Sequence, residues 1–279
     1  MTNQNFYTII YIVRRVKQLI LMHLIVSFYN PVENTILLKT LTERLRSKLD
    51  IRRQNDLFRE LALPIPHKLD LSANDYFQLR KHPKVIKASK NAIKKYGTGS
   101  AASPLISGFL SCHSQLLDKL LKWKRKPYGL IFNSGFVANQ AVFRHIPGDD
   151  DLILVDKLVH HSIIQAITSR KTKLLRYPHL NLDKLEALLI KYKNNFNSVF
   201  VATESVFSMD GDYPNLYHLA ELKKKYGFIW ILDEAHAIGY WGPKGEGLAY
   251  EYQVYDQVDI IIGTLSKTLA SSGGYMVSK

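Results

Sequence analysis

The sequence has almost no cysteine. Cys112 is the single cysteine among 279 residues. An internal disulfide and a zinc site built from cysteines are therefore both excluded. This cysteine usage suits a reducing compartment, so we expect a cytoplasmic protein, and we expect no metal site.

A Gly-Lys pair is absent from the whole chain. This absence matters because Asp233-Glu234-Ala235-His236 spells DEAH, the acidic motif of ATP-driven helicases. Such an ATPase needs an upstream phosphate loop that contains Gly-Lys, so the helicase interpretation is excluded. The net charge of +14 comes from scattered basic residues rather than from one block. Solvated faces and affinity for anionic metabolites explain it, and we expect no nucleic-acid partner.

The sequence also lacks an apolar run long enough for a membrane-spanning helix. Residues 6–29 are strongly apolar but are broken by three basic residues. The uninterrupted part, residues 19–29, is shorter than the about 20 residues that a spanning helix needs. No secretory cleavage site follows. We interpret residues 1–40 as an apolar and basic leader. It is either a membrane-surface helix through residues 6–29 or a non-functional leader upstream of a true start such as Met22.

The rest of the chain divides into an expected helical segment, residues 41–75, and an expected large domain, residues 76–279. Leucines at helical spacing predict a helix from Leu41 to Leu61, which the prolines after it end. Short apolar runs then alternate with helical stretches, which predicts an α/β fold with a mostly parallel sheet and helices on both faces. The predicted strands are 130–132, 152–155, 198–202, 228–232 and 260–262, and the predicted helices are 83–95, 114–123, 137–144, 162–169, 180–192 and 216–226.

Polar motifs follow four of these strands. Lys267 comes shortly after the strand at 260–262, and the strand at 228–232 runs into Asp233 and His236. The turn Ser134-Gly135-Phe136 leads from a strand into a helix, where backbone N–H groups can hold a phosphate. A fourth polar run, residues 204–212, follows the strand at 198–202. Each motif alone is ordinary, since a lone lysine after a strand is usually a surface residue. Together they lie at the edge where α/β sheets bind ligands.

One cofactor uses all of these groups. A lysine amine bonds covalently to the aldehyde of pyridoxal 5'-phosphate (PLP), and an acid keeps the pyridine nitrogen protonated. A histidine can bond the ring hydroxyl, and amides at a helix start can hold the phosphate. The combination therefore predicts a PLP enzyme.

At these residues the chain resembles the α-oxoamine synthases, and within them the branch that makes 8-amino-7-oxononanoate in biotin synthesis. This resemblance implies PLP-dependent transferase fold type I, which is aspartate-aminotransferase-like, with the small C-terminal domain missing. It also implies that the sheet breaks off after residues 275–277 and leaves an open edge. The matching runs are NDY (74–76), LISG through His113 (105–113), NSGFVANQAV (133–142), ESVFSMDGD (204–212), LDEAHAIG (232–239) and GTLSKTLASSGG (263–274).

The resemblance implies a role for each site residue. Lys267 would carry the cofactor and move the substrate's α-proton, and Asp233 would pair with the pyridine nitrogen. His160 would stack on the ring and contact substrate; it is chosen over His161 because the family pattern is His-x-Ser. The remaining roles are the phosphate end for Gly135, Phe136 and Thr264, the ring hydroxyl region for Ser208 and His236, and substrate contact for Arg59 and Asn74.

The implied reaction is the decarboxylative condensation of L-alanine with a pimeloyl thioester of CoA or an acyl carrier. It gives 8-amino-7-oxononanoate, CO2 and free thiol, and a homodimer would perform it. Two alternatives stay open. The chain could be another α-oxoamine synthase, such as glycine C-acetyltransferase, because the cofactor residues are shared. It could also be an inactive truncated remnant, because it stops soon after Lys267 and the arginine that binds the amino acid carboxylate lies in the missing domain.

Overall fold

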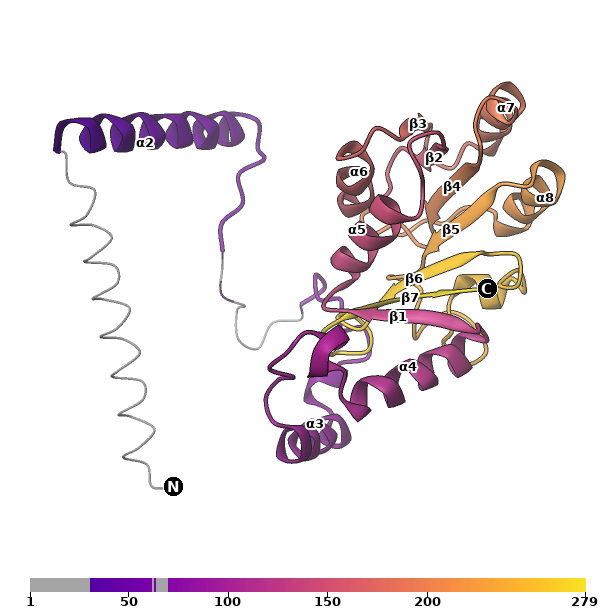
Figure 1. Ribbon diagram of the computed structural model, residues 1–279, viewed down its shortest axis with the longest axis horizontal. Coiled ribbons are helices and arrows are strands. Elements are labelled where there is room, and N and C mark those ends of the chain that lie inside the picture. Colours follow the sequence, from indigo (N-terminus) through magenta and orange to yellow (C-terminus); the bar gives the residue numbers. More distant parts are fainter. Residues whose placement is uncertain (1–30, 62, 64–69) are drawn as a thin grey trace. The chain divides into compact units, whose positions relative to one another are not determined.

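A computed structural model describes residues 31–61, 63 and 70–279. The chain divides into two compact units, residues 1–70 and residues 71–279. The first unit contains the helix α2, Pro31–Gln54, and the second contains the sheet and every other element (Figure 1). The predicted membrane contact through residues 6–29 lies outside the described residues. Among the residues that are described, no helix has the length and apolar character needed to span a bilayer.

Helix α2 differs from its prediction at both ends. It begins at Pro31, and it ends at Gln54 rather than Leu61. Asp56 adopts a left-handed backbone with φ 54°, and the Leu57 N–H donates to the Arg52 carbonyl at 2.8 Å. The Asn55 side chain donates to another carbonyl of the last turn. Asn and Asp tolerate this conformation and end helices through such bonds, so the helix ends before the prolines are reached.

A mixed sheet of seven strands organises the second unit (Figure 1). Its order is β1-β7-β6-β5-β4-β2-β3, and β7 runs antiparallel to both of its neighbours while the other pairs are parallel. Since β7 is paired on both sides, the expected open edge after residues 275–277 is wrong. The strands are β1 (Tyr128–Phe132), β2 (Leu152–Asp156), β3 (Lys173–Tyr177), β4 (Val199–Glu204), β5 (Ile229–Asp233), β6 (Ile260–Thr264) and β7 (Gly274–Ser278).

The helices of this unit follow the predicted alternation closely. The strand β3 has no counterpart among the predictions, because Lys173 and Arg176 interrupt its apolar run at an edge of the sheet. The helical elements of the second unit are η1 (Leu79–Lys81), α3 (Pro83–Tyr96), the π-helical turn η2 (Pro104–Gly108), α4 (Ser111–Lys124), α5 (Gly135–His145), α6 (His161–Thr168), α7 (Leu182–Tyr192), α8 (Leu216–Tyr226) and α9 (Leu248–Glu251).

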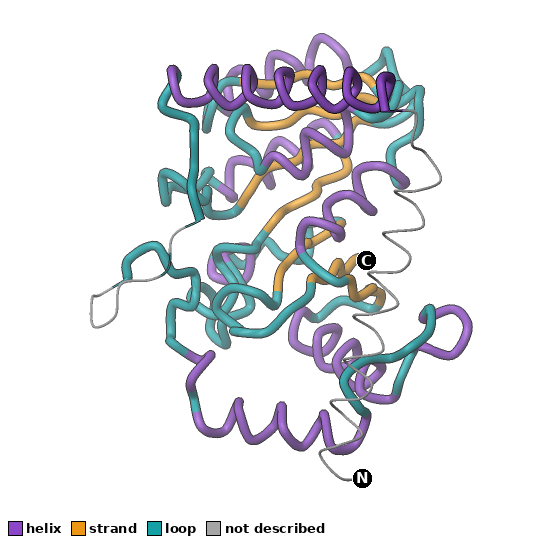
Figure 2. The backbone as a smooth tube through the Cα atoms, turned by 90° about the vertical axis from the view of Figure 1, so that its left-hand side faces the viewer, coloured by secondary structure: helices purple, strands orange, loops and turns teal. Residues whose placement is uncertain are grey.

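Apolar side chains are buried on both faces of the sheet. Along β2, Leu152 and Leu154 join one core cluster, which includes residues of α4, α7 and α8. Their neighbours Ile153 and Val155 join the other cluster, with residues of α5 and α6. This alternation explains why parallel strands read as continuous apolar runs, since helices cover both faces. The strands run through the second unit with helices outside them (Figure 2).

The last residues of four parallel strands are polar although they are buried. They are Asp156 of β2, Glu204 of β4, Asp233 of β5 and Thr264 of β6, each at most 6% exposed. Parallel strands bring their carboxyl ends to one edge of the sheet, which is where α/β folds bind ligands. Buried polar groups are costly without partners, so this edge is the place to look for a site.

Candidate active site

A cavity of about 200 Å³ opens at this edge of the sheet. Its walls come from the strand ends of β4, β5 and β6, the start of α5, the residue before α6 and the turn after β6. The lining residues are Ser134, Gly135, Phe136, Asn139, His160, Glu204, Asp233, Ala235, Thr264, Ser266 and Lys267.

One chain of hydrogen bonds fixes the acid and the imidazole in the cavity. Asn139 Nδ2 on α5 donates to Asp233 Oδ2 at 2.8 Å and to Ser162 Oγ at 3.0 Å. The Ser162 backbone N–H donates to His160 Nδ1 at 3.3 Å, so Nδ1 is an acceptor, and the Ser162 hydroxyl, 2.6 Å away, also donates to it. His160 therefore carries its ring proton on Nε2. Burial lowers the pKa of His160 although Asp233 attracts its charge, so the ring is neutral at pH 7.

A second chain leads away from the lysine. Lys267 Nζ lies 2.7 Å from His236 Nε2, and His236 Nδ1 lies 2.7 Å from the Tyr76 hydroxyl. A protonated Lys267 can only donate, so Nε2 accepts and Nδ1 carries the ring proton. Nδ1 then donates to the Tyr76 oxygen, whose proton points to Asn74 Oδ1 at 3.4 Å. The lysine is thereby tied to a turn that precedes the sheet.

Burial sets the protonation of this pair. It lowers the pKa of Lys267, although the carboxyl groups of Asp233 and Glu204 attract the ammonium charge. Burial, together with the charge of Lys267, lowers the pKa of His236 to about 4. His236 is therefore neutral at pH 7. A lysine whose amine is more readily deprotonated is suited to act as a nucleophile and as a base.

The start of α5 forms another wall of the cavity. Ser134 caps the helix by accepting a hydrogen bond from the Val137 N–H at 3.1 Å, which leaves the first backbone N–H groups, at Gly135 and Phe136, directed outward. Strand β7 passes very close to this turn, since a Cβ at Gly274 would lie 2.4 Å from the Ser134 carbonyl carbon. Only glycine permits that approach. The helix start is thus held against the sheet as an anion-binding group.

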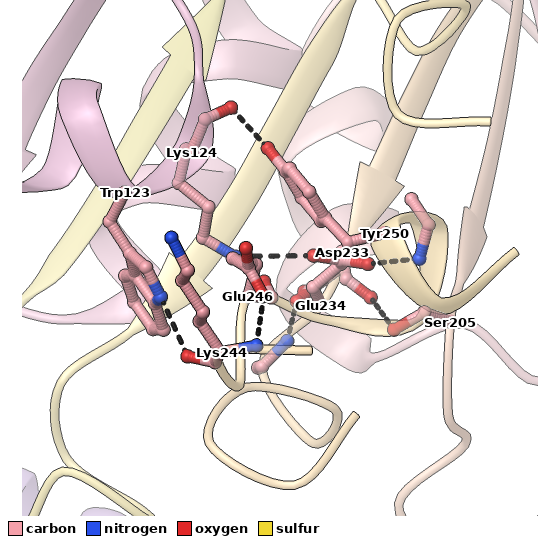
Figure 3. Close-up of polar contacts among 10 residues, drawn as sticks. Trp123, Lys124, Ser205, Asp233, Glu234, Lys244, Glu246 and Tyr250 are labelled. Atoms are coloured by element: carbon pink, nitrogen blue, oxygen red, sulfur yellow. Dashed lines mark hydrogen bonds and ion pairs between the residues drawn. The ribbon is translucent and has the colours of Figure 1, made fainter. Parts of the chain in front are cut away.

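A buried ionic network lies behind Asp233 (Figure 3). The next residue, Glu234, is fully buried and pairs with Lys124 Nζ at 3.3 Å. Lys124 also donates to the Glu246 carbonyl, and the Ala249 N–H donates to Glu234 Oε1 at 2.9 Å. Burial raises the pKa of Glu234 and lowers that of Lys124, and each charge opposes the shift of the other. The network joins the end of α4 to the turn that carries the site acid.

The structure places most of the predicted site residues together. Gly135, Phe136, His160, Asp233, Thr264 and Lys267 line the cavity, and His236 contacts Lys267. Asn74 is exposed and reaches the site only through Tyr76. Arg59 lies exposed in the first unit, so its substrate contact stays a prediction.

Ser208 departs from its expected place. It is exposed and does not line the cavity. The residue before it, Phe207, is buried and packs edge-on against His179 with ring centroids 4.5 Å apart. Because Phe207 fills the core, Ser208 faces solvent, and its bond to the cofactor stays a prediction.

Three important residues were not singled out in the sequence. Glu204 ends an apolar strand as Asp233 does, so the signal that marks one acid also marks the other. Asn139 lies one helical turn after Gly135, on the face that turns toward the cavity. Tyr76 belongs to the NDY run, but nothing local in the sequence indicates a contact with a residue 160 positions away.

His179 provides a prediction about the loop that follows β4. Its ring bonds Asp156 Oδ1 at 2.8 Å and Asp212 Oδ2 at 3.0 Å. Burial lowers the pKa of His179, but the two aspartates outweigh it and raise the pKa above 6.5. The extra stability from this charge is therefore complete below pH 6.5 and is lost as the pH rises through the folded value. Denaturant unfolding at a series of pH values should show that wild type has a higher free energy of unfolding than H179Q at acid pH, and that this difference shrinks as the pH rises. A difference in free energy of unfolding that does not change with pH would contradict this prediction.

Comparisons with known proteins identify the family of the chain. The family model described as aminotransferase class I and II matches residues 66–279. The chain belongs to this family. Its curated relatives include proteins named 8-amino-7-oxononanoate synthase. The one from Geobacter sulfurreducens is 36% identical over 208 residues, which are 75% of this chain and 53% of the relative. The one from Chlorobaculum parvum is 38% identical over 215 residues, 75% of this chain and 55% of the relative.

Solved structures show the same fold. A serine palmitoyltransferase from S. paucimobilis, described with PLP and myriocin bound, superposes with a TM-score of 0.75 at 23% identity, over 86% of this chain and 65% of that one. An 8-amino-7-oxononanoate synthase from Francisella tularensis superposes with a TM-score of 0.66 at 29% identity, over 77% of this chain and 59% of that one. The fold is PLP-dependent transferase fold type I, and the α-oxoamine synthase family is confirmed. The chain spans about half the length of the curated relatives it matches.

Proposed function

We propose that this chain is a PLP-dependent acyltransferase of the 8-amino-7-oxononanoate synthase type. One observation carries the proposal: the amine of the half-buried Lys267 shares a cavity with the buried acid Asp233 and a helix start, each from a different strand end. The names of the curated relatives, at 36% and 38% identity, support the particular member of the family.

The residues of the cavity fit the cofactor. Two buried oxygens there have no hydrogen-bond partner among the described residues, Glu204 Oε1 and Asn139 Oδ1. Such atoms are rare in a folded protein and indicate a missing polar group. Lys267 would hold PLP covalently, Asp233 would face the ring nitrogen, and the amides of Gly135 and Phe136 would face the phosphate. His160 would lie against the ring, and His236 and Thr264 would complete the set.

When bound, PLP acts as an electron sink that stabilises negative charge at the α-carbon of an amino acid. Once the substrate amine had displaced Lys267 from the cofactor aldehyde, the released amine of Lys267 would accept the α-proton, and the burial that lowers its pKa favours the neutral form that this needs. Asp233, held by Asn139 and by the Ala235 N–H at 2.9 Å, keeps a fixed negative charge in the cavity. The α-carbon would then attack the thioester carbonyl, the C–S bond would break, and the sulfur would leave as a thiolate that takes a proton from water. Loss of CO2 follows, and the lysine returns a proton to carbon.

Thiol release tests the proposal. Purified protein loaded with PLP is incubated with L-alanine and pimeloyl-CoA, and free thiol is followed with a thiol-reactive dye. We expect thiol release that requires both substrates, with one CO2 formed for each thiol. Glycine with acetyl-CoA and L-serine with palmitoyl-CoA serve as the matched comparison pairs.

Each outcome has a meaning. Faster release with another pair would assign the chain to another α-oxoamine synthase, a reading that the serine palmitoyltransferase neighbours also permit. Protein that binds PLP but releases no thiol with any pair would contradict the activity.

We also propose a cytoplasmic homodimer. Exposed apolar side chains at the β1 edge, Tyr128 and Leu130, support a contact with a second copy.

A further inference from the structure

Two acids lie side by side at the floor of the cavity. Glu204 ends β4 and Asp233 ends β5, and the two residues are register partners in the parallel pair. Adjacent strands lie about 4.8 Å apart, and register partners point to the same face. Both side chains line the cavity and both are buried, at 3% and 5% exposure. Two carboxylates in such a place repel each other, so they cannot both be ionised without a large cost.

The hydrogen bonds distinguish the two acids. Asp233 accepts from Asn139 Nδ2 at 2.8 Å and from the Ala235 N–H at 2.9 Å, one donor for each oxygen. Glu204 accepts from one donor, the backbone N–H of His160, and its Oε1 has no partner within the described part of the chain. Donors favour the ionised form of a carboxyl group, and an unpartnered buried oxygen disfavours it. The negative charge therefore belongs on Asp233 and the proton on Glu204.

We propose that Glu204 is held as a neutral carboxylic acid and serves as a hydrogen-bond donor to an acceptor oxygen of the cofactor or substrate bound in this cavity. This inference rests on the proposed function for the identity of its partner. It assigns different tasks to two acids of similar chemistry: Asp233 supplies charge, and Glu204 supplies a proton in a hydrogen bond. A neutral Glu204 also leaves a single negative charge to face the ring nitrogen.

The charged groups around Glu204 agree with this assignment. Burial and the neighbouring Asp233 raise the pKa of Glu204 to about 8, and Asp156 at the end of β2 acts in the same direction. The backbone N–H of His160, before α6, and the ammonium of Lys267, after β6, oppose the shift. The raising influences win, so the acid keeps its proton at pH 7.

Cofactor affinity tests the donor role in the loaded protein. PLP binding is measured by fluorescence titration for wild type, E204Q, E204M and D233N. Glutamine keeps a neutral donor, so E204Q should weaken binding by at most about tenfold, the worth of one neutral hydrogen bond. Methionine has a similar shape but no hydrogen-bond donor, so E204M should bind PLP more weakly than E204Q does. D233N makes the same change on the neighbouring strand and should weaken binding by more than about a hundredfold, because it removes a charge.

Two results would overturn the proposal in this experiment. If E204Q weakens PLP binding as much as D233N does, Glu204 works as a carboxylate. If E204M and E204Q bind PLP with equal affinity, Glu204 donates no hydrogen bond. If wild type binds no PLP at all, the proposed function fails instead, and the next experiment still tests the proton on Glu204.

The protein without cofactor provides that independent test. An acid whose folded pKa is raised from 4.5 to about 8 costs stability as the pH rises between these values. Wild type should therefore lose stability relative to E204Q across this range, measured by urea unfolding at a series of pH values. A wild-type to E204Q difference that does not change with pH would show that the folded and unfolded acids titrate alike, and it would overturn the neutral Glu204.

Discussion

Replacement of Lys267 by alanine should abolish the visible absorbance of the lysine-bound cofactor and lower thiol release by at least about a thousandfold. The amine lies in the cavity, 2.7 Å from His236, and no second lysine is among the lining residues. Without it, no lining residue has an amine that could bond the cofactor aldehyde, and the proposed base for the α-proton is lost. The variant K267R tests whether the positive charge alone is sufficient. Arginine keeps this charge but is not deprotonated in proteins, so K267R should also release no thiol.

The matched control is K184A, the same change on an exposed lysine of α7. Its absorbance and thiol release should equal those of wild type. Thermal unfolding of each variant separates loss of chemistry from loss of fold. If K267A keeps the visible band, or if K267R restores thiol release, Lys267 is not the cofactor anchor.

Replacement of Lys124 by methionine should destabilise the fold by about 3–5 kcal/mol, the typical cost of leaving one partner of a buried ion pair alone. The Lys124 side chain is fully buried, and so is that of its partner Glu234. Methionine fills much of the same volume, so the loss is one of charge rather than of packing. Urea unfolding gives the change in free energy.

The double variant K124M/E234Q provides the control. It removes both charges, so it should recover much of the stability that K124M loses, and the two single changes should not add. Because Glu234 follows Asp233 directly, K124M should also weaken PLP binding more than the double variant does. If the losses in free energy of unfolding from K124M and E234Q add, or if K124M loses less than about 1 kcal/mol, the pair contributes nothing beyond its separate residues.

The predicted elements match the structure where local pattern and packing agree. Helices α5, α7 and α8 and strands β2, β4 and β5 lie within two residues of their predicted bounds. The edge strand β3 was missed because its charged residues face solvent, and a half-exposed strand lacks a continuous apolar run. Helix α2 ended early because Asp56 took a left-handed backbone, which propensity at Leu57 to Leu61 does not reveal.

The sequence by itself determined the α/β rhythm, the lysine after β6 and the acid at the end of β5. Buried strands and strand-end polar residues leave local signals, and those signals were sufficient to predict PLP. Only the tertiary structure decided which acid has partners and which does not. Glu204 and Asp233 look alike in sequence, yet one carboxyl group meets two donors and the other leaves an oxygen unpartnered. Likewise, the Tyr76–His236–Lys267 chain and the Lys124–Glu234 pair join residues far apart in the sequence. Such contacts arise only when the sheet brings its strand ends to one edge, because hydrogen bonds and ion pairs depend on distance in space and not on position along the chain.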